Sequence, residues 1–325
     1  MSNSAALALA RVMAHCGGSP AEAMAYVAAA IREKPADPEP YEVIAELRRQ
    51  SPTETAAAVA APANLWQFVV GSYLYFLDGD TDQAARWLGS VTGYRPDIGW
   101  ATAPWFNSER FLATVTAHGL ADAAVNITDY GTDLDNDAVR MNLRPWLQAV
   151  NVVCERDPVA TQMARMAILL RFCGQTDESL ALCNRADAVE RVMLTEVVRA
   201  GTWGFLGHQR ERSAALRRAL QLDPANWSLY LDLADLAAAD GDFNTAANLV
   251  SQGLKHEAED VTLRAAGATY RLLAGGSLAD LDLLLELAPA LPHQGYRNGL
   301  IEQALSVEGL PTDRTMRARE LLGRH

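Results

Sequence analysis

Five glycines recur in the C-terminal half of this chain at the spacing of a helical hairpin. Gly174, Gly207, Gly241, Gly275 and Gly309 lie 33, 34, 34 and 34 residues apart. Glycine makes up about 7% of an average protein sequence, so a series this regular rarely arises by chance. A period of about 34 residues is typical of two helices joined by a tight turn. The chain is therefore expected to consist largely of helix-turn-helix repeats.

Two further columns of residues keep the same period. Small alanines precede the turn glycines by seven residues, and apolar or small side chains follow them by nine. A small residue on the first helix lets the second helix approach closely, and an apolar residue on the second helix fills the core that both share. The alanines are Ala167, Ala200, Ala234 and Ala268, and the residues of the second column are Cys183, Leu216, Val250, Leu284 and Ala318.

The best-preserved copy of the pattern spans residues 227–260, with Ala234 in the first helix and Gly241 at the turn. Residues 65–98 match almost as well, and a weaker copy covers about 3–36. In these features the sequence resembles the tetratricopeptide repeat family. The resemblance implies an all-α fold, a right-handed α-solenoid of helix-turn-helix repeats, whose concave groove binds another protein or a peptide.

Three segments interrupt the period. Residues 37–64 predict a short helix pair bounded by prolines, and residues 93–110 form an aromatic loop insertion. Residues 129–158 predict an acidic loop followed by one extra helix. We therefore expect N-terminal repeats over 1–128, an irregular region over 129–158 and C-terminal repeats over 159–325.

Composition limits the classes of partner and the compartment. Forty acidic residues against 28 basic ones give a net charge of −12, which opposes attraction to nucleic acid and to anionic membranes. Cys16, Cys154, Cys173 and Cys183 form no metal-ligand spacing and predict buried free thiols. The first residues lack the pattern of a signal peptide, which favours a cytoplasmic protein.

Residues 55–77 carry no charge and approach the length of a membrane span. Pro62 and Asn64 near the middle indicate instead a junction between two short helices. We therefore predict no membrane insertion.

A search for catalytic spacing finds no phosphate-binding loop, nucleophile elbow or dinucleotide fingerprint. His256-Glu257 is not completed by a second histidine, so no zinc site is predicted. The sequence thus predicts a non-enzymatic protein without cofactor or metal.

The residues three, six, ten and thirteen positions before each turn glycine share one face of the first helix, and in the family this face lines the concave groove. The predicted groove is mostly neutral, small or aromatic, which favours a protein or peptide partner with apolar or aromatic anchors. Arg165 or Arg171 would bind one acidic group of that partner. Before Gly79 these positions hold Phe76, Tyr73, Val69 and Trp66; before Gly241, Ala238, Asp235, Leu231 and Ser228; before Gly309, Ser306, Gln303, Gly299 and Tyr296.

The insertion carries four aromatic residues, Tyr94, Trp100, Trp105 and Phe106, although loops are usually polar. Two interpretations are open. Buried aromatics could fill a gap where two repeat segments meet, because they contribute much of any core. Alternatively, some remain accessible as anchors, since Trp and Tyr are favoured at interface hot spots.

Three hypotheses for function follow. The first is a non-enzymatic scaffold that binds a protein or peptide. The second is the recognition subunit of an enzyme whose chemistry belongs to a separate polypeptide. The third is a small-molecule or cryptic catalytic site near residues 93–158.

Overall fold

The computed structural model describes residues 3–15, 18–131 and 134–323, and throughout these ranges the secondary structure is helical, without a strand. The chain divides into two compact units, Met1–Val198 (unit 1) and Arg199–His325 (unit 2). The sequence pattern predicts no boundary near Val198. Cys16 lies outside the described residues.

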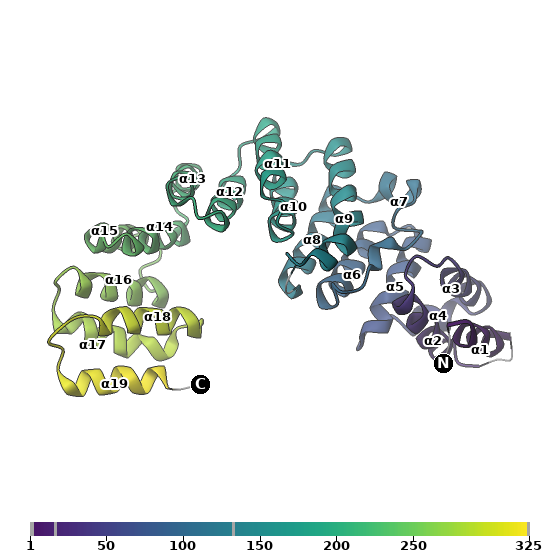
Figure 1. Cartoon of the computed structure of the whole chain (residues 1–325), viewed down its shortest axis with the longest axis horizontal. Coiled ribbons are helices and arrows are strands. Elements are labelled where there is room, and N and C mark those ends of the chain that lie inside the picture. The colour runs from purple at the N-terminus through teal and green to yellow at the C-terminus, as the bar shows by residue number, and fades with distance from the viewer. Residues whose placement is uncertain (1–2, 16–17, 132–133, 324–325) are drawn as a thin grey trace. The chain divides into compact units, whose positions relative to one another are not determined.

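Unit 1 consists of helical hairpins and irregular connections (Figure 1). Its helices are α1 (Asn3–His15), α2 (Pro20–Glu33), α3 (Glu39–Gln50), α4 (Pro52–Ala57), α5 (Leu65–Asp78), α6 (Thr81–Tyr94), η1 (Trp100–Thr102), α7 (Glu109–Thr114), α8 (Ala117–Tyr130), α9 (Asp137–Arg156), α10 (Ala160–Phe172) and α11 (Thr176–Val189). Helix α12 (Met193–Phe205) crosses the boundary between the units.

Unit 2 continues with hairpins in which each pair of helices packs on the next (Figure 1). Its helices are α13 (Gln209–Leu222), α14 (Trp227–Ala239), α15 (Phe243–Gly253), α16 (Val261–Leu273), α17 (Leu278–Leu287), η2 (Ala288–Ala290), α18 (Gln294–Leu305) and α19 (Thr312–Leu322).

The turn glycines occupy the left-handed backbone region that the pattern requires. All five members of the series have φ between 73° and 91°, and Gly79 between α5 and α6 has φ 88°. Gly79 donates its N–H to the Phe76 carbonyl, and the next N–H, of Asp80, reaches back to Tyr75. A side chain would strain this backbone, so glycine ends the first helix and lets the chain reverse at once.

The alanine column lies where the two helices of each hairpin meet. Ala167, Ala234 and Ala268 are fully buried, and Ala200 is buried almost completely. A larger side chain there would separate the helices of the hairpin. The predicted register of the repeats is thereby confirmed.

Glycines also bring α6 and α8 of unit 1 into close contact. A Cβ added at Gly89 would lie 2.7 Å from the carbonyl oxygen of Ala123, and one at Gly93 would lie 2.6 Å from that of Asn126. The helices approach backbone to backbone at both positions. Helix α8 packs against α10 on its other side and so carries the repeat past the insertion.

The segments outside the repeat period contain helices of unequal length. Residues 37–64 hold the short helices α3 and α4, and the extra helix of the third segment is the long α9. The uncharged stretch 55–77 is broken between α4 and α5. None of the described helices combines the length and the apolar character needed to span a membrane.

Candidate functional site

The aromatic face of α5 is covered by the loop that follows α6. The ring of Phe76 lies 5.2 Å from that of Trp105, and the guanidinium of Arg110 lies over Phe76 at 4.8 Å. Tyr73 packs edge-on against Tyr41 and also contacts Trp105. Two sets of predicted site residues, those of α5 and those of the loop, therefore pack on each other.

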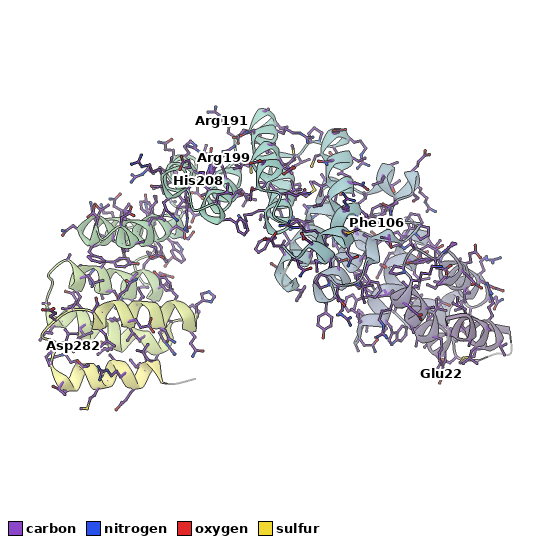
Figure 2. The ribbon with its side chains drawn as sticks, viewed as in Figure 1. Glu22, Phe106, Arg191, Arg199, His208 and Asp282 are labelled. Carbon is purple, nitrogen blue, oxygen red and sulfur yellow. The ribbon has the colours of Figure 1, made fainter. Side chains whose placement is uncertain are left out.

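Three aromatics of the loop belong to the core. Trp100 is 2% exposed, Trp105 5% and Phe106 0%. The indole N–H of Trp100 donates to the Arg95 carbonyl at 3.0 Å, and the Phe106 ring packs edge-on against Trp146 on α9, with the ring centroids 4.5 Å apart. Figure 2 places Phe106 among the helices of unit 1. The burial of these three residues, and of Phe76, favours the core interpretation over the anchor interpretation.

Tyr94 is the loop aromatic that remains accessible, with 68% of its surface exposed. It lines a groove of about 750 Å³ with Phe68, Asn126 and the equally exposed Tyr130. The groove follows α6 and α8 and does not involve the predicted face of α5. Trp66, at the start of α5, is half-buried beside a smaller cavity of about 200 Å³.

The two predicted arginines are engaged within unit 1. Arg165 on α10 lies 2.8 Å from the carboxylate of Asp122 on α8 and donates to Gln162. Arg171 donates to the Val198 carbonyl at 3.4 Å, and its guanidinium lies 5.2 Å from the ring of Phe172. Burial lowers the pKa of Arg171 from its ordinary value. Both cations therefore help to hold adjacent helices together.

Unit 2 brings predicted groove positions from different repeats to one cavity. The cavity measures about 220 Å³ and lies between the first helices of three successive hairpins. Its residues come from α14 (Asp235, Ala239), α16 (Tyr270) and α18 (Gly295, Tyr296, Gly299, Leu300, Gln303).

Two tyrosine hydroxyls converge on one oxygen of the Asp235 carboxylate. Tyr296 donates to Oδ1 at 2.9 Å, and Tyr270 donates to the same atom. The second oxygen, Oδ2, accepts no hydrogen bond from the residues that the structure describes. Asp235 is half-buried and lines the cavity, so its carboxylate can accept a further hydrogen bond there.

Burial dominates the electrostatics of this carboxylate. It raises the pKa of Asp235, although the two tyrosine hydrogen bonds and the positive charge of Arg212 lower it. Burial and the neighbouring Asp235 raise the pKa of Asp232, one turn earlier on α14. Burial also raises the pKa values of Tyr270 and Tyr296, so both hydroxyls stay protonated donors.

Two glycines of α18 leave the cavity open. A Cβ added at Gly295 or Gly299 would meet no atom within 4 Å. Glycine in a helix costs roughly 0.5–1 kcal/mol relative to alanine. At Gly295 and Gly299 no close packing requires a glycine, and the absence of side chains leaves space beside Tyr296.

No protein-family model matches this sequence, and no curated protein matches it significantly. Solved structures that resemble parts of it include MamA, at 11% identity and a TM-score of 0.36, which covers 60% of this chain and 99% of its own. A tetratricopeptide repeat protein of Parabacteroides merdae has 13% identity, a TM-score of 0.39 and coverage of 98% and 97%. The C-terminal part of a repeat protein of Cytophaga hutchinsonii has 9% identity, a TM-score of 0.41 and coverage of 90% and 98%.

The architecture is decided by the chain's own geometry, since left-handed glycines recur at the repeat period and each reverses the chain between two antiparallel helices. The chain is an all-α protein built of helix-turn-helix repeats. In the hairpins of unit 2, four of the eight residues that line the cavity hold predicted groove positions: Asp235, Tyr296, Gly299 and Gln303.

The sequence pattern places Asp235 on this groove face and selects Tyr296 as a site residue, but it does not single out Asp235 or Tyr270. Tyr270 lies five residues before its turn glycine, outside the four groove positions. A long side chain reaches the groove from this neighbouring position. The signal in the sequence is a charged residue, Asp235, on a groove face that is otherwise mostly neutral. The described residues contain no group of three side chains placed to hold a metal ion.

Proposed function

We propose that this protein is a non-enzymatic scaffold that binds a peptide segment of another protein along the first-helix face of unit 2. The observation that carries the proposal is the cavity itself. Groove positions of α14 and α18 meet there with Tyr270 of α16, around one carboxylate and two tyrosines.

A repeat protein offers one extended face because the same helix of each hairpin faces the same side. A peptide lying on that face contacts successive hairpins and gains specificity from the side chains that enter cavities. Tyrosine supplies apolar contact and a hydroxyl at low entropic cost, which suits an interface. Tyr296 is half-buried and borders the cavity, so it can contact such a peptide.

Charge and thiol chemistry guide the choice of partner and compartment. The net charge of −12 disfavours nucleic acid and anionic lipid as ligands. Burial raises the pKa of Cys154 to about 11 and that of Cys173 to about 12, so both remain unreactive thiols. We place the protein in the cytoplasm, where free thiols persist.

Selection from a library of random peptides against the full chain tests this function. Selected peptides are then titrated by fluorescence anisotropy against the wild type, Tyr296→Ala and Tyr130→Ala. We expect Tyr296→Ala to weaken binding about tenfold or more, the effect of losing an interface anchor. Tyr130, an exposed tyrosine of unit 1, is the matched control and should have no effect.

Two results would contradict the proposal. If no peptide is enriched over an unrelated helical protein, the chain is not a peptide-binding scaffold. If Tyr130→Ala weakens binding and Tyr296→Ala does not, the peptide lies on unit 1 and the assigned face is wrong.

A second candidate function uses the groove of unit 1. Its volume of about 750 Å³ falls within the range of about 300–1,000 Å³ that small-molecule sites occupy. Its walls combine aromatic residues with Ser90 and Asn126, whose side chains are joined by a 3.1 Å hydrogen bond. Native mass spectrometry of the purified chain tests this function, and a bound metabolite lost in Tyr94→Ala would support it.

A further inference from the structure

The cavity of unit 2 is too small for a whole metabolite. At about 220 Å³ it lies below the range of about 300–1,000 Å³ that is typical of small-molecule sites. It is large enough for the end of one side chain. A protruding residue of a peptide fits this space, whereas a compact ligand of ordinary size would leave most of its surface in solvent.

The charges around the cavity favour a cation. Asp235 is the one carboxylate among the residues that line it, and none of these residues is a lysine, arginine or histidine. Asp232 adds a second carboxylate close by on α14. Arg212 lies near enough to act on both, but the structure records no ion pair between it and either carboxylate in the described part of unit 2.

The hydrogen bonds around Asp235 leave it prepared for one more donor. Both tyrosine hydroxyls bind Oδ1 and fix the orientation of the carboxylate. The other oxygen, Oδ2, is then the remaining acceptor of a carboxylate that lines the cavity. A charged N–H donor forms a shorter and stronger hydrogen bond with a carboxylate than a neutral donor does. A cation also contacts aromatic rings favourably, and two tyrosines line the site.

We infer that this cavity holds a basic side chain, arginine or lysine, of the bound peptide, with its cationic end at Oδ2 of Asp235. The inference rests on the proposed function and names the chemistry of its ligand. The opening left by Gly295 and Gly299 admits the aliphatic stem of the basic residue, and the tyrosines flank its charged end.

The peptide library provides the first test, applied in parallel to the wild type, Asp235→Asn and Asp240→Asn. Asparagine keeps the size of the residue and an oxygen that accepts the tyrosine hydroxyls, but it removes the charge. Asp240 is an exposed acid at the C-terminal end of the same helix and serves as the matched control. We expect the wild type and Asp240→Asn to enrich peptides with a basic residue at one fixed position, and Asp235→Asn to lose this preference.

The second test changes the peptide and the volume of the cavity. Citrulline has nearly the shape of arginine without its charge, and its substitution at the fixed position should weaken binding about tenfold or more, the scale of a charged hydrogen bond. Gly299→Leu fills the cavity without altering a charge and should weaken binding to a similar degree. Circular dichroism confirms that each variant is folded.

Selected peptides without a basic preference, equal binding of the citrulline peptide, or full binding by Gly299→Leu would overturn the inference while leaving the scaffold function intact. Failure to select any peptide would instead contradict the function. In that case the cavity is tested with N-acetyl-arginine amide and its citrulline analogue as probes, and ligand-observed NMR measures the binding of each probe. Stronger binding of the arginine probe, lost in Asp235→Asn, supports the inference, and equal or absent binding of the two probes refutes it.

Discussion

Gly89 on α6 lies directly against the backbone of Ala123 on α8, so that an added Cβ would be 2.8 Å from the Ala123 Cα. Two backbone segments in contact cannot move apart without separating the helices over several turns. The contact of α6 with α8 thus depends on a glycine that makes no turn.

Gly89→Ala should therefore destabilise the protein. We expect a loss of about 1–3 kcal/mol in the free energy of unfolding, the usual cost of overpacking. Urea denaturation followed by circular dichroism measures it. Gly299→Ala on α18 is the matched control, because its Cβ meets open space and the helix should gain roughly 0.5–1 kcal/mol. Equal effects of the two substitutions would contradict the close approach.

Ala234→Leu tests the register of the repeats. Ala234 is fully buried on α14, so the larger side chain should cost about 1–3 kcal/mol of stability through overpacking. Asp240→Ala, at the exposed end of the same helix, should change stability by less than about 1 kcal/mol. If the two variants unfolded at the same urea concentration, Ala234 would not face the second helix.

Trp105→Ala tests the assignment of the loop to the core. The Trp105 ring contacts Phe76, Phe111 and Phe106, so its removal should cost about 3–5 kcal/mol. Tyr94→Ala removes an exposed ring of the same insertion and should change stability by no more than about 0.5 kcal/mol. Thermal denaturation distinguishes the two, and an unchanged melting temperature for Trp105→Ala would disprove the burial.

Asp235→Asn should become more stable relative to the wild type as the pH rises. Below about pH 3.9, the ordinary pKa of an unfolded aspartate, the acid is protonated in both states and no penalty exists. Because burial raises the pKa in the folded state, the wild type loses stability as the pH rises from there through the folded pKa, whereas asparagine does not titrate.

Asp242→Asn should show the opposite trend and serves as the control. Hydrogen bonds from the side chain and backbone of Thr245 lower the pKa of Asp242, so its stabilising effect is present at neutral pH and is lost as the pH falls through the folded pKa. Urea denaturation at several pH values measures both differences in unfolding free energy. If both differences changed in the same direction with pH, burial would not be what determines the pKa of Asp235.

The repeat architecture was predictable because it is periodic. Each hairpin needs a left-handed residue at its turn and a small residue between its helices, so the same requirement recurs about every 34 residues. Gly241 and Ala234 meet these two requirements within one hairpin, and the structure places both as expected. A periodic signal of this kind is visible in a single sequence.

The aromatic loop and the cavity were less predictable because their contacts are specific to single positions. Phe76 and Trp105 meet through an insertion that follows no period, so the sequence does not reveal that each ring covers the other. The cavity forms because the packing of α14 on α16 brings Asp235 and Tyr270 within hydrogen-bonding distance. Helical spacing assigns residues to a face, but it does not determine which long side chains converge across three helices.

The loop that covers α5 also limits what a binding experiment can report. Because residues 95–111 are tethered to unit 1 at both ends, they occupy the α5 face at an effective concentration on the order of millimolar or higher. A free peptide used at micromolar concentration competes poorly with such an internal occupant. Selection against the intact chain will therefore sample surfaces other than the α5 face, and replacing the loop by a short linker would expose an apolar strip that promotes self-association.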